Sequence, residues 1–290
     1  NNGARPRKDL DNLFFVPYYE EGKYDLAILH IDQQCVDYGI GKSWRYTDLT
    51  NVITDIPKIV INHGTPMWPE NRFGWSEDEI RERMKIMLGG NKMVVNSNQA
   101  VDRWGWGNPI IHGMDHNDWW DLPKEPHSIT VLSPSGLDRY YNRRLLSATK
   151  EELQRHYDLT HVQVTVEWRI EEHPTLHGWD AYRDFIGRSL IYFNPTLDSP
   201  MPRSRTEAML SGACVVTTRY HGAQDFIKNG ENGFLVIDNP TTIAELIADL
   251  ILNRYREAKE IGQRGKQTAI ELFSRKRYRD DWLRLIEEVL

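Results

Sequence analysis

The sequence predicts an α/β protein built from two units, in each of which parallel strands are joined by helices. From Tyr24 onward, short apolar runs alternate with amphipathic segments, which is the pattern of strands connected by crossover helices. The polar and aromatic stretch DHNDWWDLPKEP, at residues 115–126, lacks this period and predicts a connection between the units. A chain of 290 residues also has the length of about two domains. We therefore expect a first unit at residues 1–121 and a second at residues 122–275.

The first half begins with two apolar runs that are typical of buried strands, at residues 25–31 and 58–62. A helix is expected after Ser76, because Ser76 and Glu79 have the spacing of a capping box and the apolar residues that follow share one helical face. Gly89 is expected to end this helix. A strand, a helix capped by Ser97 and a short extended piece complete the half, at residues 92–96, 97–104 and 109–111.

The second half is expected to repeat the alternation. Its strands are predicted at residues 128–132, 162–166, 189–193, 214–217 and 233–237. Its helices are predicted at residues 141–157, 180–186 and 204–210, and after Asn239, which precedes a proline at the first helical position. A final amphipathic helix at residues 276–290 carries an apolar stripe, which must be buried against one of the two units or across both.

The composition excludes several classes of protein. With 40% hydrophobic and 27% charged residues the chain is neither disordered nor collagen-like, and it needs no disulfide or metal to hold its core. Its 36 basic and 42 acidic residues give a net charge of −6, so no overall positive field attracts nucleic acid, which is not an expected partner. Any bound anion must therefore be held locally.

The cysteines and the apolar runs suggest where the chain resides. Cys35 and Cys214 lie in apolar contexts and form no zinc-binding pattern, which favours a reduced, cytoplasmic setting. The longest apolar stretches are far shorter than the roughly 20 residues of a transmembrane helix, and residues 1–12 contain no signal-peptide core. We expect a cytoplasmic protein without a transmembrane segment.

The most informative stretch for function is the connection that leads to Glu207. The strand at residues 189–193 ends in Asn194-Pro195, a loop follows, and Glu207 lies at the start of a helix that ends before Gly212. Ligands of open α/β sheets bind outside the carboxyl ends of strands, where helix amino termini offer free N–H groups to anions. The sequence therefore predicts a phosphate site at this loop.

At this point the chain resembles the retaining, nucleotide-sugar-dependent glycosyltransferases of family 4, also called glycosyl transferases group 1. The matching segments are Pro195-Thr196, Glu207-Ala208-Met209 with Gly212 and Val215-Val216, and Asn229 to Val236. In the first half, Val94 to Ser97 and Ile110 to Asp115 with Trp119 also match. The resemblance implies the GT-B architecture: two Rossmann-like domains with a deep cleft between them, the acceptor side first and the nucleotide-sugar side second. The family's glycine-rich loop has no counterpart in residues 1–23, so the resemblance implies a shortened N-terminal domain.

The resemblance also implies an activity. The enzyme would transfer a hexosyl unit from a UDP- or GDP-linked sugar to an acceptor that is a glycan, a lipid or another molecule. No metal or other cofactor would be required, because arginines and a helix amino terminus stabilise the leaving diphosphate. Two alternatives stay open: a catalytically degenerate protein that binds a nucleotide sugar or a glycan, and an enzyme such as an epimerase that acts on the nucleotide sugar itself.

Glu207 and His63 are the two individual candidates that the resemblance identifies. Glu207 matches the glutamate that binds the ribose hydroxyls, although its spacing from Ser204 also fits a helix capping box. His63 lies where the family has a histidine facing the donor sugar, and it is the catalytic candidate. The alternative for His63 is a structural hydrogen bond at the end of a strand.

The donor phosphates and the donor sugar require further contacts. The family's second glutamate is replaced by Ser199, beside Asp198, and the glycines that usually follow are replaced by Pro200, Met201 and Pro202. Proline has no N–H to offer a phosphate, so arginines are expected to compensate, unless they form only solvated helix starts. The expected donor-binding residues are Glu207, Arg139, Arg143, Arg144, Arg203, Arg205, Ser199, Asp198 and Thr206. Ten tryptophans, including the Trp119-Trp120 pair, are candidates for stacking on sugars or for filling cores.

Overall fold

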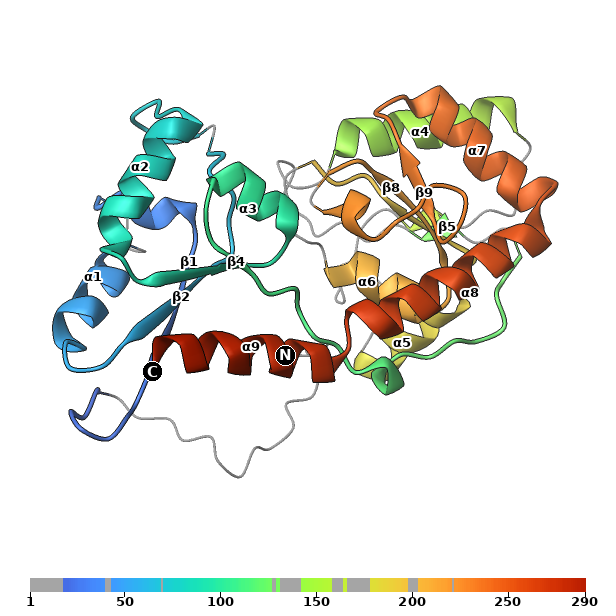
Figure 1. The fold of residues 1–290 in the computed structure, drawn as a ribbon. Coiled ribbons are helices and arrows are strands. Elements are labelled where there is room, and N and C mark those ends of the chain that lie inside the picture. The colour runs from blue at the N-terminus through green and yellow to red at the C-terminus, as the bar shows by residue number, and fades with distance from the viewer. Residues whose placement is uncertain are drawn as a thin grey trace. The chain divides into compact units, whose positions relative to one another are not determined.

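The computed structural model describes residues 18–39, 43–68, 70–126, 129–130, 142–157, 164–165, 178–197, 203–220 and 222–290. The chain forms two compact units (Figure 1). We call residues 113–275 the C-terminal unit, and the described residues between 18 and 112 together with residues 276–290 the N-terminal unit. The units divide at residues 112 and 113, whereas the sequence analysis placed the division near Asp121.

The N-terminal unit is built on a parallel sheet with the strand order β1-β2-β3-β4. The strands are β1 (Ala27–Ile31), β2 (Lys58–Asn62), β3 (Lys92–Val95) and β4 (Asn108–Pro109). The connections contain a short 3-10 helix, η1 (Gln33–Val36), and the helices α1 (Ser43–Val52), α2 (Glu77–Leu88) and α3 (Asn98–Trp104). The strands and helices predicted between residues 25 and 111 are present, and α1 is a helix that the sequence analysis did not identify.

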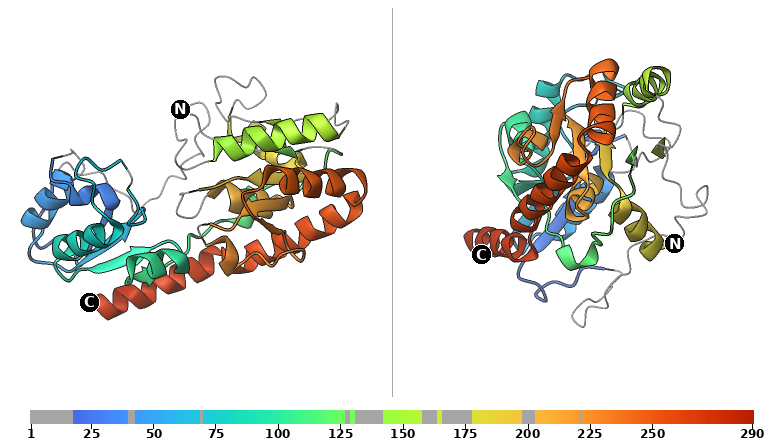
Figure 2. Two further views of the ribbon diagram at one scale, coloured as in Figure 1. Left: turned by 90° about the horizontal axis from the view of Figure 1, so that it is seen from above. Right: turned by 90° about the vertical axis from the view of Figure 1, so that its right-hand side faces the viewer.

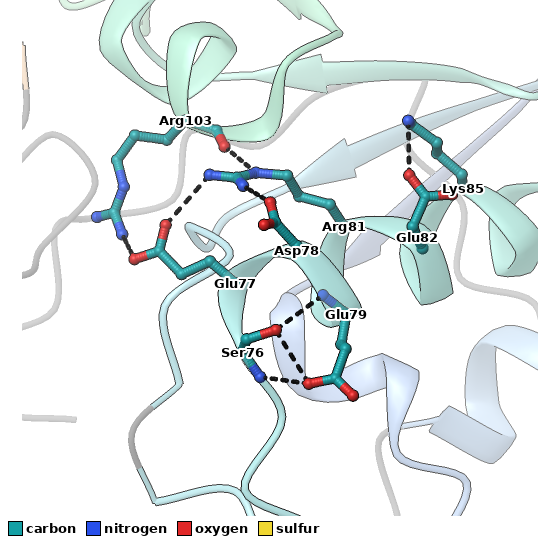
Figure 3. A network of polar contacts seen from close by, with 8 residues as sticks. All are labelled: Ser76, Glu77, Asp78, Glu79, Arg81, Glu82, Lys85 and Arg103. Carbon is teal, nitrogen blue, oxygen red and sulfur yellow. Dashed lines mark hydrogen bonds and ion pairs between the residues drawn. The ribbon is translucent and has the colours of Figure 1, made fainter.

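Local signals in the sequence determine where α2 begins and how it meets α3. The Ser76 hydroxyl accepts a hydrogen bond from the Glu79 N–H at 3.3 Å, and Glu79 Oε2 accepts one from the Ser76 N–H at 2.8 Å, which completes the predicted capping box (Figure 3). From the first turn of α2, Glu77 Oε1 reaches Arg103 of α3 at 2.5 Å (Figure 3). The two helices are thereby joined by charge as well as by packing.

The last helix, α9 (Arg275–Val289), covers one side of the N-terminal sheet (Figures 1 and 2). Leu285 is only 5% exposed and belongs to one hydrophobic cluster with Ile59, Val94 and Ile110. Arg277 adds a hydrogen bond of 2.5 Å to the Ile111 carbonyl. The apolar stripe that the sequence predicted is therefore buried against the strands of the N-terminal unit.

The C-terminal unit is built on a second parallel sheet, with the strand order β6-β5-β7-β8-β9. The strands are β5 (Ile129–Thr130), β6 (Val164–Thr165), β7 (Ile191–Asn194), β8 (Cys214–Thr218) and β9 (Phe234–Val236). The helices are α4 (Arg143–His156), α5 (Trp179–Arg188), α6 (Arg203–Leu210), α7 (Pro240–Leu252) and α8 (Tyr255–Leu272), with α4 and α7 on one face of the sheet and α5 and α6 on the other (Figure 1). Leucines of α4 and isoleucines of α7 share one core with β7 and β8.

Helix α8 is the second helix that the sequence analysis did not identify. Its buried positions are mostly small residues, including Gly262 and Gly265. A Cβ added at Gly262 would lie 2.3 Å from the Gly212 carbonyl oxygen, and one added at Gly265 would lie 2.7 Å from the Asn232 carbonyl oxygen. The helix uses glycine because it passes directly against backbone, and a contact face of this kind has few large apolar residues to reveal it. Among the described helices, none is both long and apolar enough to cross a lipid bilayer.

Candidate functional site

The strand order of the C-terminal sheet determines where a ligand can bind. β5 lies between β6 and β7, so the chain leaves β5 toward one side of the sheet and later passes to its other side. At such a switch point the connections diverge and leave a crevice outside the carboxyl ends of the strands. The two connections meet here, because the Asn142 N–H, just before α4, donates to the Pro195 carbonyl at 2.8 Å. The start of α4 therefore lies beside the loop that leads to α6.

Buried polar side chains hold the strand ends at this switch point. Asn194 Oδ1 accepts hydrogen bonds from Thr196 Oγ1 at 2.5 Å and from Thr217 Oγ1 at 3.3 Å. Thr218 Oγ1 donates to the Thr196 carbonyl at 2.6 Å. Thr206, predicted to bind the donor, is fully buried, and its hydroxyl has no hydrogen-bond partner among the described residues. The carboxyl ends of β7 and β8 are therefore held by side chains as well as by the sheet.

Glu207 lies in α6, where it is half-buried. Its Oε2 accepts a hydrogen bond from the Tyr182 hydroxyl of α5 at 2.5 Å. Ser204 lies inside α6, which begins at Arg203, so Ser204 is not the N-cap of this helix. The capping box that offered an alternative role for Glu207 is therefore not formed at these two residues, and the carboxylate is held by a neighbouring helix instead.

Aromatic side chains surround the partner of Glu207. The Tyr182 ring lies 6.0 Å from the Trp119 ring in an edge-to-face arrangement and 5.9 Å from the Trp179 ring. Trp119 and Trp179 are themselves edge to face at 5.2 Å. From the sequence, Trp119 is a candidate for sugar stacking or for core packing, and its indole is only 4% exposed, as in a core. Tyr182 is not recognisable from the sequence, because it has the appearance of an ordinary core position of an amphipathic helix.

The predicted phosphate-binding arginines occupy different environments. Arg205 has no exposed surface, lies 5.1 Å from the centre of the Phe226 ring and donates to the Tyr220 carbonyl at 3.3 Å. Burial lowers the pKa of its guanidinium to about 10. The predicted role of Arg205 in phosphate binding does not fit this interior position. By contrast, Arg144 and Arg203 are exposed, and Arg143 is half-buried at the start of α4. Three predicted residues, Arg139, Asp198 and Ser199, lie outside the described residues.

The catalytic candidate His63 belongs to the N-terminal unit and directly follows β2. Its backbone N–H donates to the Ile31 carbonyl at 2.9 Å, which fixes the residue at the carboxyl edge of the sheet. Its Nε2 lies 2.8 Å from Nδ1 of His30, and the two rings are stacked. Although the residue keeps exposed surface, loss of water around the ring lowers the pKa of His63, the neighbouring His30 lowers it further, and Asp32 opposes both effects.

Comparison with known proteins adds three findings. Residues 168–268 match the family model described as Glycosyl transferases group 1. The chain is 29% identical over 111 residues to the lipopolysaccharide core biosynthesis glycosyltransferase LpsE of Rhizobium meliloti, covering 38% of this chain and 32% of that protein. It is also 28% identical over 110 residues to sucrose synthase of Thermosynechococcus vestitus, covering 37% of this chain and 13% of that protein. The chain thus spans about a third or less of these curated relatives.

Solved structures agree on the fold. TarM of S. aureus superposes with a TM-score of 0.68 at 16% identity, covering 89% of this chain and 54% of that one. HepE of Anabaena, solved in complex with UDP and glucose, also has a TM-score of 0.68 at 16% identity, covering 91% of this chain and 78% of that one. The chain therefore has the GT-B fold, as predicted, with one parallel α/β unit on each side of residue 112.

Proposed function

We propose that this chain, whose residues 168–268 match the model of the group 1 glycosyl transferases, transfers a hexosyl unit from a nucleoside diphosphate sugar to an acceptor with retention at the anomeric carbon. The observation that carries the proposal is the half-buried Glu207 carboxylate, which α6 and Tyr182 hold beside the switch point of the C-terminal sheet. The complex of HepE with UDP and glucose supports a nucleotide-sugar donor.

The C-terminal unit would hold the nucleotide. In this proposal Glu207 accepts hydrogen bonds from the two ribose hydroxyls, and the diphosphate lies near the amino ends of α4 and α6. Arg143 and Arg144 begin α4, and a positive charge at a helix amino terminus is unfavourable unless an anion neutralises it. Arg203 begins α6 in the same way. Arg139, Asp198 and Ser199 follow the same two strands in the sequence and remain proposed donor contacts.

The chemical step follows from the charge that develops. The bond between the anomeric carbon and the diphosphate breaks, and the acceptor oxygen forms its bond on the same face of the sugar. The departing phosphate oxygen takes the acceptor proton, while the arginines stabilise the charge on the diphosphate. His63 would contact the transferred sugar from the N-terminal unit, with its ring orientation set by His30.

A second candidate, a protein that binds nucleotide sugars without transferring them, is favoured by one feature. Pro200 and Pro202 precede Glu207 in the sequence, and neither residue offers an N–H to a phosphate. One experiment tests both candidates. Thermal shift with UDP, GDP and their sugar conjugates identifies the base, since a ligand at 100 times its Kd stabilises a fold by about 2.7 kcal/mol.

Release of the nucleoside diphosphate is then measured with the sugar conjugate that binds. Transfer or slow hydrolysis supports the enzyme. Binding without any release supports the binding protein, and no stabilisation by any conjugate contradicts both candidates.

A further inference from the structure

We infer that Tyr182 is a positioning residue for nucleotide binding: its hydroxyl holds the Glu207 carboxylate in the orientation that receives the ribose. The inference rests on the proposed function and extends it to a residue on another helix. Tyr182 lies in α5 and Glu207 in α6, and their side-chain oxygens are 2.5 Å apart. A hydroxyl that donates to a carboxylate at this distance makes a strong, charge-assisted hydrogen bond.

The phenol is itself held in place. Tyr182 is 5% exposed, and its ring contacts the rings of Trp119 and Trp179, which also contact each other. A ring that is packed edge to face against one indole, that of Trp119, and tilted against a second, that of Trp179, has few other positions available to it. The hydroxyl therefore points at Glu207 because the ring cannot turn elsewhere.

A neighbouring residue attaches this aromatic cluster to the rest of the unit. The Arg183 guanidinium lies 4.2 Å from the centre of the Trp120 ring and 5.5 Å from that of Trp179, and it donates to the Asp118 carbonyl at 3.3 Å. These contacts fasten the segment that contains Trp119 and Trp120 to α5. The orientation of Tyr182 thus depends on a segment far from Glu207 in the sequence.

This arrangement suits the binding of a diol. Each carboxylate oxygen can accept more than one hydrogen bond, so the bond from Tyr182 to Oε2 is compatible with further bonds from the ribose hydroxyls. A freely rotating glutamate side chain would lose conformational entropy when the nucleotide binds, and that loss would weaken binding. Because Tyr182 already fixes the Glu207 carboxylate, this loss does not occur again on binding. Removal of the Tyr182 hydroxyl should therefore weaken the nucleotide without removing any group that touches it.

The experiment is a double-mutant cycle on the full chain. Calorimetric titration of UDP and GDP, and of their 2′,3′-dideoxy analogues, is carried out on wild type, Tyr182→Phe, Glu207→Gln and the double variant. We expect Tyr182→Phe to bind the nucleotide roughly fivefold more weakly and to discriminate less well against the dideoxy analogue. In the Glu207→Gln background the same change should alter affinity less than about twofold.

Tyr255→Phe is the matched control. The Tyr255 hydroxyl donates to the Lys124 carbonyl at 3.2 Å in the same unit, so this variant also loses one tyrosine hydroxyl bond but no contact with Glu207. It should bind the nucleotide like wild type. If Tyr182→Phe is too unstable to titrate, Trp179→Leu is used instead, which leaves both hydrogen-bonding groups in place and should give a smaller loss in the same direction.

The outcomes separate this inference from the proposed function. Normal nucleotide affinity in a folded Glu207→Gln variant would overturn the proposed function and the inference with it. A weakened Glu207→Gln variant beside a normal Tyr182→Phe variant would overturn the inference alone. An equal loss from Tyr182→Phe in both backgrounds would also overturn it, because the hydroxyl would then act independently of Glu207.

Discussion

Each of the two sheets has a candidate residue at the carboxyl ends of its strands. The two residues, Glu207 and His63, are held in place in different ways. In the C-terminal unit, Glu207 is half-buried and bound by a tyrosine that two tryptophans hold in place. In the N-terminal unit, His63 is exposed and its partner is a second titratable ring, that of His30. The first arrangement fixes one orientation of a charged group, whereas the second pairs two side chains of the same ionisable type.

This difference suits two kinds of task. A nucleotide carries the same ribose and diphosphate whichever sugar is attached, so its site gains from rigid, preorganised contacts. A group that faces the sugar during transfer must accommodate a changing charge. In the proposed function Glu207 would bind the nucleotide and His63 would face the sugar, and the following predictions test that comparison.

The largest expected effect concerns the independence of the two units. Leu285→Ala removes a side chain that is 5% exposed and packed with Ile59, Val94 and Ile110, so it should destabilise the N-terminal unit by about 2 to 4 kcal/mol. Chemical denaturation monitored by circular dichroism measures the loss. Nucleotide affinity, measured below the unfolding transition, should stay unchanged. Weaker nucleotide binding in the folded variant would mean that the two units do not divide their tasks as we describe.

The next effect concerns Glu207. Glu207→Gln keeps the size of the side chain but removes the charge, so the nucleotide should bind tenfold or more weakly, about 1.4 kcal/mol or above, while most of the unfolding free energy is retained. Calorimetry gives the affinity and thermal denaturation gives the stability. The control is Glu271→Gln on the surface of α8, which should change neither quantity. The reverse result, lost stability with normal affinity, would assign Glu207 a structural role only.

Strong local signals made much of the fold predictable from the sequence. The helix that starts after Ser76 and the helix that starts after Asn239 both have the predicted N-cap residues, and α9 has its predicted stripe. Helix α8 was missed because its contact face consists largely of glycine and alanine, which carry no hydrophobic period. Helix α8 packs closely against backbone from other parts of the chain, and those parts come near the helix only when the chain is folded.

The candidate site was less predictable. Motif resemblance located Glu207 but not Tyr182, because a hydrogen bond between two helices leaves no mark in the local sequence. Arg205 shows the opposite error: it stands among arginines and prolines in a loop-like stretch, yet the fold turns its side chain inward against Phe226. Charge alone in a sequence does not tell which of several neighbouring arginines will face solvent.

A smaller effect separates the arginines from one another. Arg203→Ala and Arg144→Ala remove exposed charges at the starts of α6 and α4, and each should weaken the nucleoside diphosphate by several-fold up to about tenfold while sparing the bare nucleoside. Arg205→Ala should instead lower the free energy of unfolding, because it empties a buried position and removes the donor to the Tyr220 carbonyl. Parallel calorimetry and thermal denaturation distinguish the two patterns. A selective loss of diphosphate affinity in a stable Arg205→Ala variant would contradict the interior role.

The smallest expected effect is the pH response of His63. Because its pKa is lowered in the folded chain, protonation favours the unfolded state, in which an ordinary histidine titrates near pH 6.5. The stabilising contribution is therefore complete above about pH 6.5 and is lost as the pH falls through the lower, folded pKa. His63→Asn should flatten the dependence of stability on pH over that interval. Denaturation midpoints at closely spaced pH values between 5 and 8 measure the difference, and NMR titration of the ring protons assigns it to His63. A His63 resonance that titrates above pH 6.5 would reverse the sign of the effect and contradict the prediction.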